Sequence, residues 1–194
     1  MKTFTIEQIA RSERLVKKFQ PEDSYILSYR EFIAYFAGLE GITAHNLVIG
    51  AHFAYGWMPT ILELKKTAEF IPSAVTILNE AKRGREITEE DLQVLRDTIN
   101  NSLVGASKLL HFVNPNSYAI WDSRVFKYIN GQPAYNYQMQ NTQNYLGYLA
   151  NCKEITETNE FKPVHASMNA KLGYAVSPFR AVELIMFMNS INKQ

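Results

Sequence analysis

An all-helical fold is the class that this sequence predicts, on three observations. Apolar residues recur at helical spacing along most of the chain, no stretch alternates long enough to predict a sheet, and helix start and stop signals bound the apolar segments. The 194 residues, 46% of them hydrophobic and 20% charged, suffice to bury a core. We therefore expect a compact multi-helix domain over residues 1–194, either as one body or as two lobes with a cleft between them.

Each expected helix is bounded by residues that typically start or end helices. In chain order, helices are expected over residues 4–19, 29–37, 43–53, 59–64, 72–83, 88–100, 106–113, 122–130 and 177–192. Thr43, Thr88 and Asp122 can cap N-termini, because their side-chain oxygens accept hydrogen bonds from the unpaired amides of a first turn. Pro21 and Gly131 end helices, since proline lacks the amide and glycine readily adopts the left-handed conformation.

Composition and charge exclude several classes of protein. The 20 lysines and arginines against 19 aspartates and glutamates leave a net charge of +1, which excludes a broadly polycationic surface. The single cysteine, Cys152, excludes an internal disulfide and is expected to be a small buried apolar residue. No apolar run reaches the ~18 residues that span a bilayer, and the N-terminal segment is charged, unlike a signal peptide. We expect a soluble, cytoplasmic protein with no membrane partner.

Motifs for metal, nucleotide or acyl-transfer chemistry are missing from the sequence. It contains no HExxH, GxSxG, Walker loop or GxGxxG. The histidines have no carboxylates at ligand spacing, so each is expected to be a core or surface residue with one hydrogen-bond partner. They are His45, His52, His111 and His165. We therefore expect neither a metal site nor a cofactor.

A tract from Tyr128 to Cys152 contains no charged residue, while tyrosine, asparagine and glutamine are abundant in it. One interpretation is a surface loop and short helix whose tyrosines pack on the core. The other is an aromatic, hydrogen-bonding surface for bases or sugars, because tyrosine faces stack and amides hydrogen-bond polar edges.

Asp122 is the carboxylate with the most distinctive surroundings. Aspartate is scarce in this chain, and Asp122 follows the bulky pair Ile120 and Trp121 where a helix is expected to begin. The simplest interpretation is an N-cap, worth about 1 kcal/mol on replacement by alanine. Residues 102–122, SLVGASKLLHFVNPNSYAIWD, place a glycine, a helix with a lysine and a loop before this aspartate.

Residues 103–128 resemble the signature region of the helix-hairpin-helix DNA glycosylases. In that family a glycine-rich hairpin precedes a helix with the lyase lysine, and a loop leads to a proline-hydrophobic-aspartate segment whose aspartate is catalytic. This chain has one hairpin glycine, Gly105, and Ala119 stands where the family often has proline. Ser107 occupies the usual place of the family's lysine or serine, and Lys108 follows one residue later.

The resemblance implies an enzyme that hydrolyses the N-glycosidic bond of a damaged or modified base in DNA, in repair or against foreign DNA. Asp122 would stabilise the oxocarbenium-like sugar or activate the nucleophile, and Lys108 would form a Schiff base with the sugar. The base pocket would use Trp57, Trp121, Phe53, Tyr55 and Ser107. DNA-backbone contacts would come from Val104, Gly105, Ala106, Arg124 and Lys127.

Two other functions are compatible with the same residues. A non-catalytic helical module would bind DNA or protein, with Tyr135, Tyr137 and Tyr145 on its interaction surface. A small-molecule enzyme would use Asp122 as an acid or base in an aromatic pocket, and the sequence indicates no substrate for it. The simplest interpretation of Lys108 itself is a solvated helix lysine.

Overall fold

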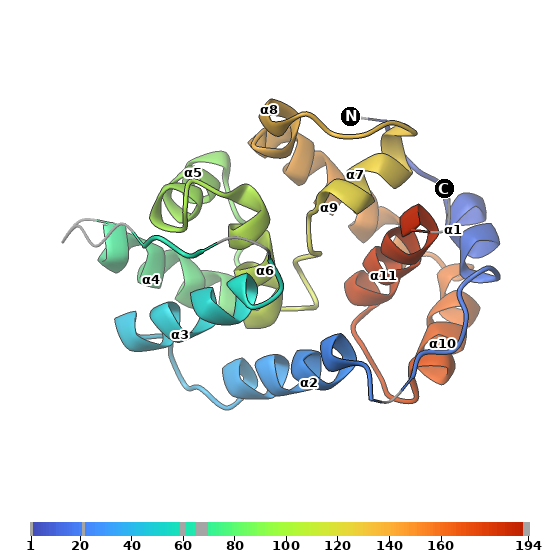
Figure 1. Cartoon of the computed structure of the whole chain (residues 1–194), viewed down its shortest axis with the longest axis horizontal. Coiled ribbons are helices and arrows are strands. Elements are labelled where there is room, and N and C mark those ends of the chain that lie inside the picture. The colour runs from blue at the N-terminus through green and yellow to red at the C-terminus, as the bar shows by residue number, and fades with distance from the viewer. Residues whose placement is uncertain (1, 21, 59–60, 65–69, 192–194) are drawn as a thin grey trace. The chain divides into compact units, whose positions relative to one another are not determined.

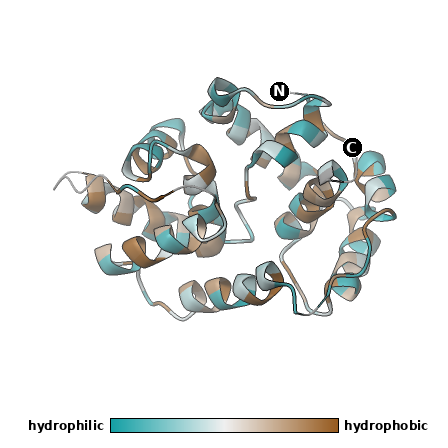
Figure 2. Cartoon of the chain, viewed as in Figure 1, coloured by the Kyte–Doolittle hydropathy of each residue, from teal (hydrophilic) through white to brown (hydrophobic). Residues whose placement is uncertain are grey.

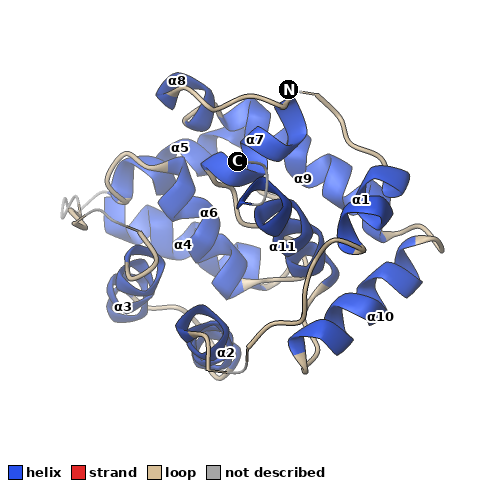
Figure 3. Ribbon diagram, turned by 45° about the vertical axis from the view of Figure 1, so that its right-hand side comes forward, coloured by secondary structure: helices blue, strands red, loops and turns tan. Residues whose placement is uncertain are grey.

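The computed structural model describes residues 2–20, 22–58, 61–64 and 70–191, and it is all-helical as the sequence predicts. Eleven α-helices lie in the described part of the chain, where Figure 3 shows no strand (Figures 1 and 3). The chain divides into two units, which are described separately below. One comprises residues 24–118, and the other joins residues 1–23 to residues 119–194.

The unit of residues 24–118 contains helices α2 to α6. Their bounds are α2 Ser24–Ala37, α3 Ala44–Tyr55, α4 Phe70–Lys82, α5 Glu89–Thr98 and α6 Leu103–Val113. Helix α6 packs against the other four, and all its residues except Val104 are buried. A helix that is apolar on all sides is typical of the centre of a core. The polar side chains of α6, such as Lys108, are therefore buried as well.

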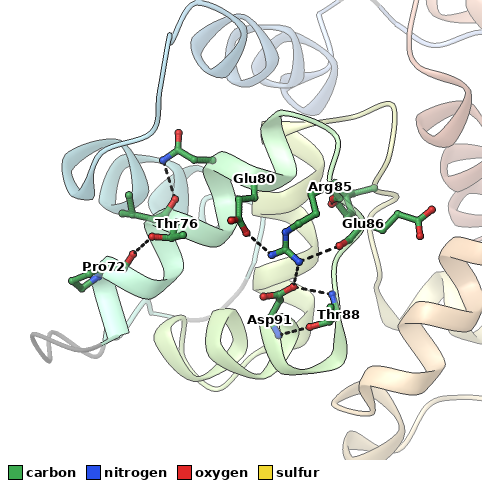
Figure 4. A network of polar contacts seen from close by, with 10 residues as sticks. Pro72, Thr76, Glu80, Arg85, Glu86, Thr88 and Asp91 are labelled. Atoms are coloured by element: carbon green, nitrogen blue, oxygen red, sulfur yellow. Dashed lines mark hydrogen bonds and ion pairs between the residues drawn. The ribbon is translucent and has the colours of Figure 1, made fainter.

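A polar network joins the end of α4 to the start of α5 (Figure 4). Thr88 caps α5 as predicted: its hydroxyl accepts a hydrogen bond from the Asp91 amide, and the Asp91 carboxylate accepts one from the Thr88 amide. The Arg85 guanidinium pairs with Asp91 at 2.9 Å and with Glu80 at 2.7 Å. The connection between α4 and α5 is therefore held by a cap and two ion pairs.

The other unit contains α1 and α7 to α11. Their bounds are α1 Ile6–Glu13, α7 Ser123–Asn130, α8 Asn136–Met139, α9 Thr142–Thr156, α10 Phe161–Leu172 and α11 Pro178–Ile191. Helix α11 contacts α1, α7, α9 and α10, and its hydrophobic residues recur along its length (Figure 2). Every residue from Phe179 to Met186 is buried. This helix is the centre of the second core.

Buried asparagines attach the N-terminal segment to this second core. The Asn151 side chain accepts a hydrogen bond from the Phe4 amide at 2.8 Å and donates one to the Phe4 carbonyl at 3.1 Å. Asn189 donates to the carbonyl of Ser12 at 3.0 Å. The two bonds from Asn151 satisfy the backbone amide and carbonyl of the buried residue Phe4. They explain how residues so far apart in the sequence belong to one unit.

The expected helix over residues 59–64 is wrong for its described part. Residues 61–64 are not helical: Leu64 forms an isolated bridge with Ile99, and Asn100 holds the segment extended. The Asn100 side chain accepts from the Glu63 amide at 2.6 Å and donates to the Ile61 carbonyl at 2.8 Å. Residues 59 and 60 lie outside the described part. Local apolar spacing could not reveal partners 35 or more residues away.

Other boundaries also differ from the expected ones. Helix α1 ends at Glu13 instead of residue 19, α2 begins at Ser24 instead of residue 29, and α6 begins at Leu103, before Gly105. Helix α10 was not expected, and α9 was expected only as a short helix in one interpretation of the uncharged tract. In α9 the buried residues include Thr142 and Asn151 among tyrosines, so its buried face lacks a clear apolar stripe.

Candidate functional site

Asp122 caps the N-terminus of α7, as its position in the sequence predicts. One carboxylate oxygen, Oδ1, accepts hydrogen bonds from the amides of Arg124 at 2.9 Å and Val125 at 2.8 Å. These bonds use two of the first-turn amides that lack helical acceptors, and the helix dipole favours negative charge there. The side chain is half-buried. The carboxylate is therefore held in a fixed orientation.

Trp121 supports Asp122 from within the core. Its ring is fully buried, its indole nitrogen donates to the Met139 carbonyl at 3.1 Å, and it contacts the rings of Phe126 and Tyr148. The expectation that Trp121 lines a base pocket is therefore wrong, because a ring without accessible surface cannot stack on a ligand. Its role is to fix the backbone that carries Asp122.

Lys108 is buried rather than solvated. Its side chain is on α6, only 7% of the residue is exposed, and the ammonium group donates a hydrogen bond to the Trp57 carbonyl at 3.2 Å. Lysine is rarely buried, because removing its charge from water costs free energy unless polar groups replace the water. The interpretation of Lys108 as an exposed helix lysine is therefore wrong.

A tight connection over residues 99–102 joins α5 to α6. Asn100 and Asn101 have φ angles of +54° and +51°, the left-handed conformation that asparagine tolerates better than most residues. Ser102 then caps α6 by accepting a hydrogen bond from the Gly105 amide at 3.1 Å. The turn between the two helices therefore lies at residues 99–102, and the expected hairpin glycine, Gly105, lies inside α6 instead.

Gly105 serves close packing, not phosphate binding. A Cβ atom at this position would lie 2.9 Å from Cε2 of Tyr55 and 3.3 Å from Cγ2 of Ile99. Its amide donates to Ser102 Oγ, and the Ala106 amide donates to the Ser102 carbonyl. The expectation of phosphate contacts from Gly105 and Ala106 is therefore corrected, because both amides already have acceptors and both residues are buried. Val104 is half-buried in the first turn and stays a candidate.

Two further pocket candidates also have structural roles. Ser107 is fully buried, and its hydroxyl donates to the Val104 carbonyl at 2.9 Å. Tyr55 is 6% exposed, and burial raises the pKa of its hydroxyl although Ser102 and Asn100 lower it. Neither side chain presents a surface on which a base could stack.

Trp57 is the centre of a half-exposed aromatic cluster in the unit of residues 24–118. Its indole nitrogen donates to Ser28 Oγ at 3.0 Å. Its ring contacts four others with centroids 5.4–6.2 Å apart: Tyr25, Tyr29, Phe32 and Phe112. Phe53 stacks on Phe32 at 4.4 Å. The cluster keeps Trp57 and Phe53 as candidates for a ligand surface.

The sequence reasoning missed the contribution of α2 to this cluster. Tyr25, Tyr29 and Phe32 lie one helical turn apart, so their spacing was a signal that one face of α2 is aromatic. Tyr25 is 56% exposed and forms the accessible edge of the cluster.

His111 lies beneath the cluster as a core histidine, as expected. Its Nδ1 is 2.6 Å from the Tyr118 carbonyl, and its Nε2 is 3.0 Å from the Tyr29 hydroxyl. The ring is fully buried. Both nitrogens therefore have polar neighbours, one more than predicted.

Arg124 and Lys127, the proposed phosphate contacts on α7, differ in setting. Arg124 is exposed, and its guanidinium lies 4.5 Å from the centroid of the Phe187 ring. Lys127 is half-buried near the end of the helix. The cation–π contact orients Arg124 without using its hydrogen-bond donors.

The candidate residues fall into two sets, one in each unit. In the unit of residues 24–118, Lys108 binds the carbonyl of Trp57, and Phe53 joins the aromatic cluster of Trp57 through its contact with Phe32. Asp122, Arg124 and Lys127 belong to the unit of residues 1–23 and 119–194. Each set is positioned by its own hydrophobic core.

Comparisons with family models, with curated proteins and with solved structures each found no match to this chain. Within the described ranges, no group of three or more histidine, cysteine or carboxylate side chains is placed to hold a metal ion. Over the same residues, no helix is long and apolar enough to cross a membrane.

Proposed function

We propose that this protein is a DNA glycosylase-like enzyme that removes a damaged or modified base, using Asp122 and Lys108. The observation that carries the proposal is the burial of Lys108. A buried lysine beside an aromatic cluster with an accessible edge is a candidate nucleophile toward a ligand held on that cluster. Lys108 lies in the second helix of the pair α5 and α6, and Asp122 precedes the next helix, an order that agrees with the resemblance described above.

The chemistry assigned to Asp122 follows from its fixed negative charge. As the glycosidic C–N bond breaks, the base leaves with the electron pair and the sugar acquires oxocarbenium character. The carboxylate stabilises that cation, or accepts a proton from an attacking water that forms the new C–O bond. Two amide hydrogen bonds hold the carboxylate ready for this role.

Lys108 would replace water as the nucleophile in a second mode. Its neutral amine forms a C–N bond at C1′ as the base leaves with the electron pair of the glycosidic bond and takes up a proton. Opening of the sugar ring then gives a Schiff base, from which the strand can be cleaved. Removal of the base without covalent capture would assign the reaction to Asp122 and water alone.

The aromatic cluster around Trp57 would receive the base after it leaves the stack. Glycosylases must extrude their target nucleotide, and aromatic faces recover part of the lost stacking energy. Tyr25 and Phe53 offer further ring surface beside Trp57. Val104, Arg124 and Lys127 would contact the DNA backbone. A cytoplasmic location, where thiols stay reduced, suits the single buried cysteine.

The test incubates the protein with DNA that contains diverse damaged and modified bases, detects abasic sites, and adds borohydride in a parallel sample. Asp122→Asn is the decisive variant, because asparagine also caps helices and should leave α7 intact. It should lose base removal, whereas Asp97→Asn, on the half-buried face of α5, should retain it. Lys108→Ala should lose borohydride trapping. Full activity in folded Asp122→Asn would overturn the proposal.

A non-catalytic binding module is the second candidate, and one surface favours it. Tyr135 and Tyr137 are 65% and 72% exposed, and their rings are nearly parallel with centroids 6.0 Å apart. Tyr145 does not belong to this surface: it is fully buried and donates to the Ala119 carbonyl at 3.0 Å. Exposed tyrosines with no charged neighbours in sequence are typical of interaction surfaces.

This alternative predicts DNA or protein binding without any abasic product. Replacing both Tyr135 and Tyr137 by serine should then abolish binding of labelled DNA, as measured by fluorescence anisotropy. The Asp122→Asn variant should still bind it. Unchanged affinity in the double variant would contradict a DNA-binding role for this tyrosine pair.

A further inference from the structure

An open cavity of about 220 Å³ lies in the unit of residues 1–23 and 119–194, where α1 meets α7. It is lined by Phe4, Gln8, Arg11, Ser12, Tyr128 and Ile129. None of these residues belongs to the glycosylase-like site described above. The cavity therefore needs an explanation of its own.

Arg11 supplies the charge of this cavity, and it has no acidic partner in the described part of the chain. The two nearest carboxylates along α1 are engaged elsewhere. Glu7, one turn earlier, interacts with Thr5 and with its own backbone amide, which lowers the pKa of its carboxyl. Glu13 is buried, paired with Lys171 at 2.5 Å. The planar guanidinium thus keeps its donors for another acceptor.

The remaining walls combine hydrogen-bonding and apolar groups. The Tyr128 hydroxyl lies 2.7 Å from Ser12 Oγ, which fixes both groups at the edge of the cavity. Gln8 uses its amide oxygen to accept from the Thr5 amide at 3.0 Å. Phe4 and Ile129 are buried apolar side chains that line the cavity. The site therefore combines one cationic group, Arg11, with hydrogen-bonding groups and an apolar wall.

We propose that this cavity binds a small organic carboxylate, whose acidic group pairs with Arg11 and whose apolar body covers Phe4 and Ile129. The guanidinium matches a carboxylate through two parallel hydrogen bonds. Inorganic phosphate fits less well, because it gains nothing from the apolar side chains of Phe4 and Ile129. The volume is below the ~300–1,000 Å³ of pockets for drug-sized ligands, so the ligand is a single ring or a short chain.

The carboxylate could belong to a free metabolite or to the chain terminus of a peptide, and the same pairing would recognise both. Benzoate represents the first source, and a short peptide that ends in phenylalanine represents the second. The cavity admits benzoate whole, whereas the peptide inserts only its terminal residue. Tighter binding of the peptide than of benzoate would assign the site to a chain terminus.

The experiment is a titration of the full chain with benzoate, followed by ¹H–¹⁵N NMR. Benzamide, which has the same shape without the charge, and inorganic phosphate are titrated in parallel. The expected result is that benzoate shifts the amide signals of residues 8–12 and 128–129, and that benzamide and phosphate bind at least about tenfold more weakly.

Arg11→Gln should weaken benzoate binding by about ten- to a hundredfold, because one charge-assisted pairing is lost. Arg14→Gln is the matched control: it removes an exposed arginine just after α1 that does not line the cavity, and it should bind benzoate as the unmodified chain does. Arg11→Lys keeps the positive charge but cannot form two parallel hydrogen bonds, so its affinity for benzoate should lie between those of Arg11→Gln and the unmodified chain. Equal binding of benzoate and benzamide, or an unchanged affinity in folded Arg11→Gln, would overturn the proposal.

Discussion

The ammonium group of Lys108 donates a hydrogen bond to the carbonyl of Trp57, 51 residues earlier in the chain. That carbonyl lies just beyond the C-terminus of α3, where helices leave carbonyl groups without helical donors. A lysine near such a terminus is stabilising because it satisfies a carbonyl and opposes the negative end of the helix dipole. Lys108 therefore has a structural role that must be separated from any chemical role.

Substitutions at Lys108 can separate the two roles. Lys108→Ala should lower the free energy of unfolding by about 1–3 kcal/mol, because the Trp57 carbonyl loses a buried donor. Lys108→Gln keeps a donor and should recover part of that loss, yet it has no nucleophilic amine. Urea unfolding measures the first effect and borohydride trapping the second. Trapping that persists in Lys108→Gln would show that another residue is the nucleophile.

Asp122 should matter little to stability as long as the cap survives. Asp122→Ala should lower the free energy of unfolding by about 1 kcal/mol, since two first-turn amides of α7 lose their acceptor. Asp122→Asn should stay within about 0.5 kcal/mol of the unmodified chain. Chemical denaturation of both variants measures the difference. Equal stabilities for the alanine and asparagine variants would refute the capping role.

Gly105 should be intolerant of even one added methyl group. Alanine is normally favoured over glycine within helices by about 1 kcal/mol. At Gly105 the added Cβ would approach the Tyr55 ring, so Gly105→Ala should instead destabilise the protein by about 1–3 kcal/mol. Gly147→Ala, at an exposed position of α9, is the control and should be neutral or stabilising. Denaturant midpoints compare the two variants, and a stabilising Gly105→Ala would contradict this packing.

Asp91 should make folding sensitive to acid. Burial alone would raise the pKa of its carboxyl, but hydrogen bonds from Arg85 and Thr88 outweigh burial and hold the pKa below its ordinary value of 3.8. Since the folded-state pKa is the lower one, the stabilisation is present above pH 3.8 and is lost as the pH falls through the folded-state pKa.

Asp91→Asn should therefore be less stable at neutral pH and lose less stability on acidification. Unfolding by urea at several pH values between about 6 and about 2 measures this dependence. Glu90→Gln, which changes the exposed carboxylate one position earlier, is the control and should keep the acid dependence of the unmodified chain. An identical pH dependence in the Asp91 variant would exclude this carboxylate as its source.

Cys152 should be unreactive in the folded protein. The thiol is fully buried, and burial raises its pKa far above the ordinary value, although the Tyr148 hydroxyl acts in the opposite direction. Because the thiolate is the reactive form, alkylation by iodoacetamide requires unfolding. Mass spectrometry should find no modified protein in buffer and complete modification in concentrated urea. Rapid alkylation under native conditions would show that this core opens readily.

The sequence by itself determined the helical class, the absence of common catalytic motifs, and the caps at Thr43, Thr88 and Asp122. These features depend on residues that are neighbours along the chain: a cap bonds an amide two or three positions away, and an apolar stripe repeats every turn. The same logic correctly identified Cys152 as a core residue. Burial of a small apolar side chain needs no particular partner.

Only the tertiary structure decided how the remaining candidates are used. Trp121 and Lys108 are both buried: Trp121 supports the backbone before Asp122, and Lys108 binds a carbonyl just beyond the end of α3. Hydrogen bonds with Asn100, and not their own apolar spacing, decide the conformation of residues 61–64. Arg11 and Tyr128 line the same cavity although they are far apart in sequence. Such outcomes depend on contacts between segments that are distant in sequence. A pattern of neighbouring residues cannot predict them, because it does not indicate which distant residue each side chain will contact.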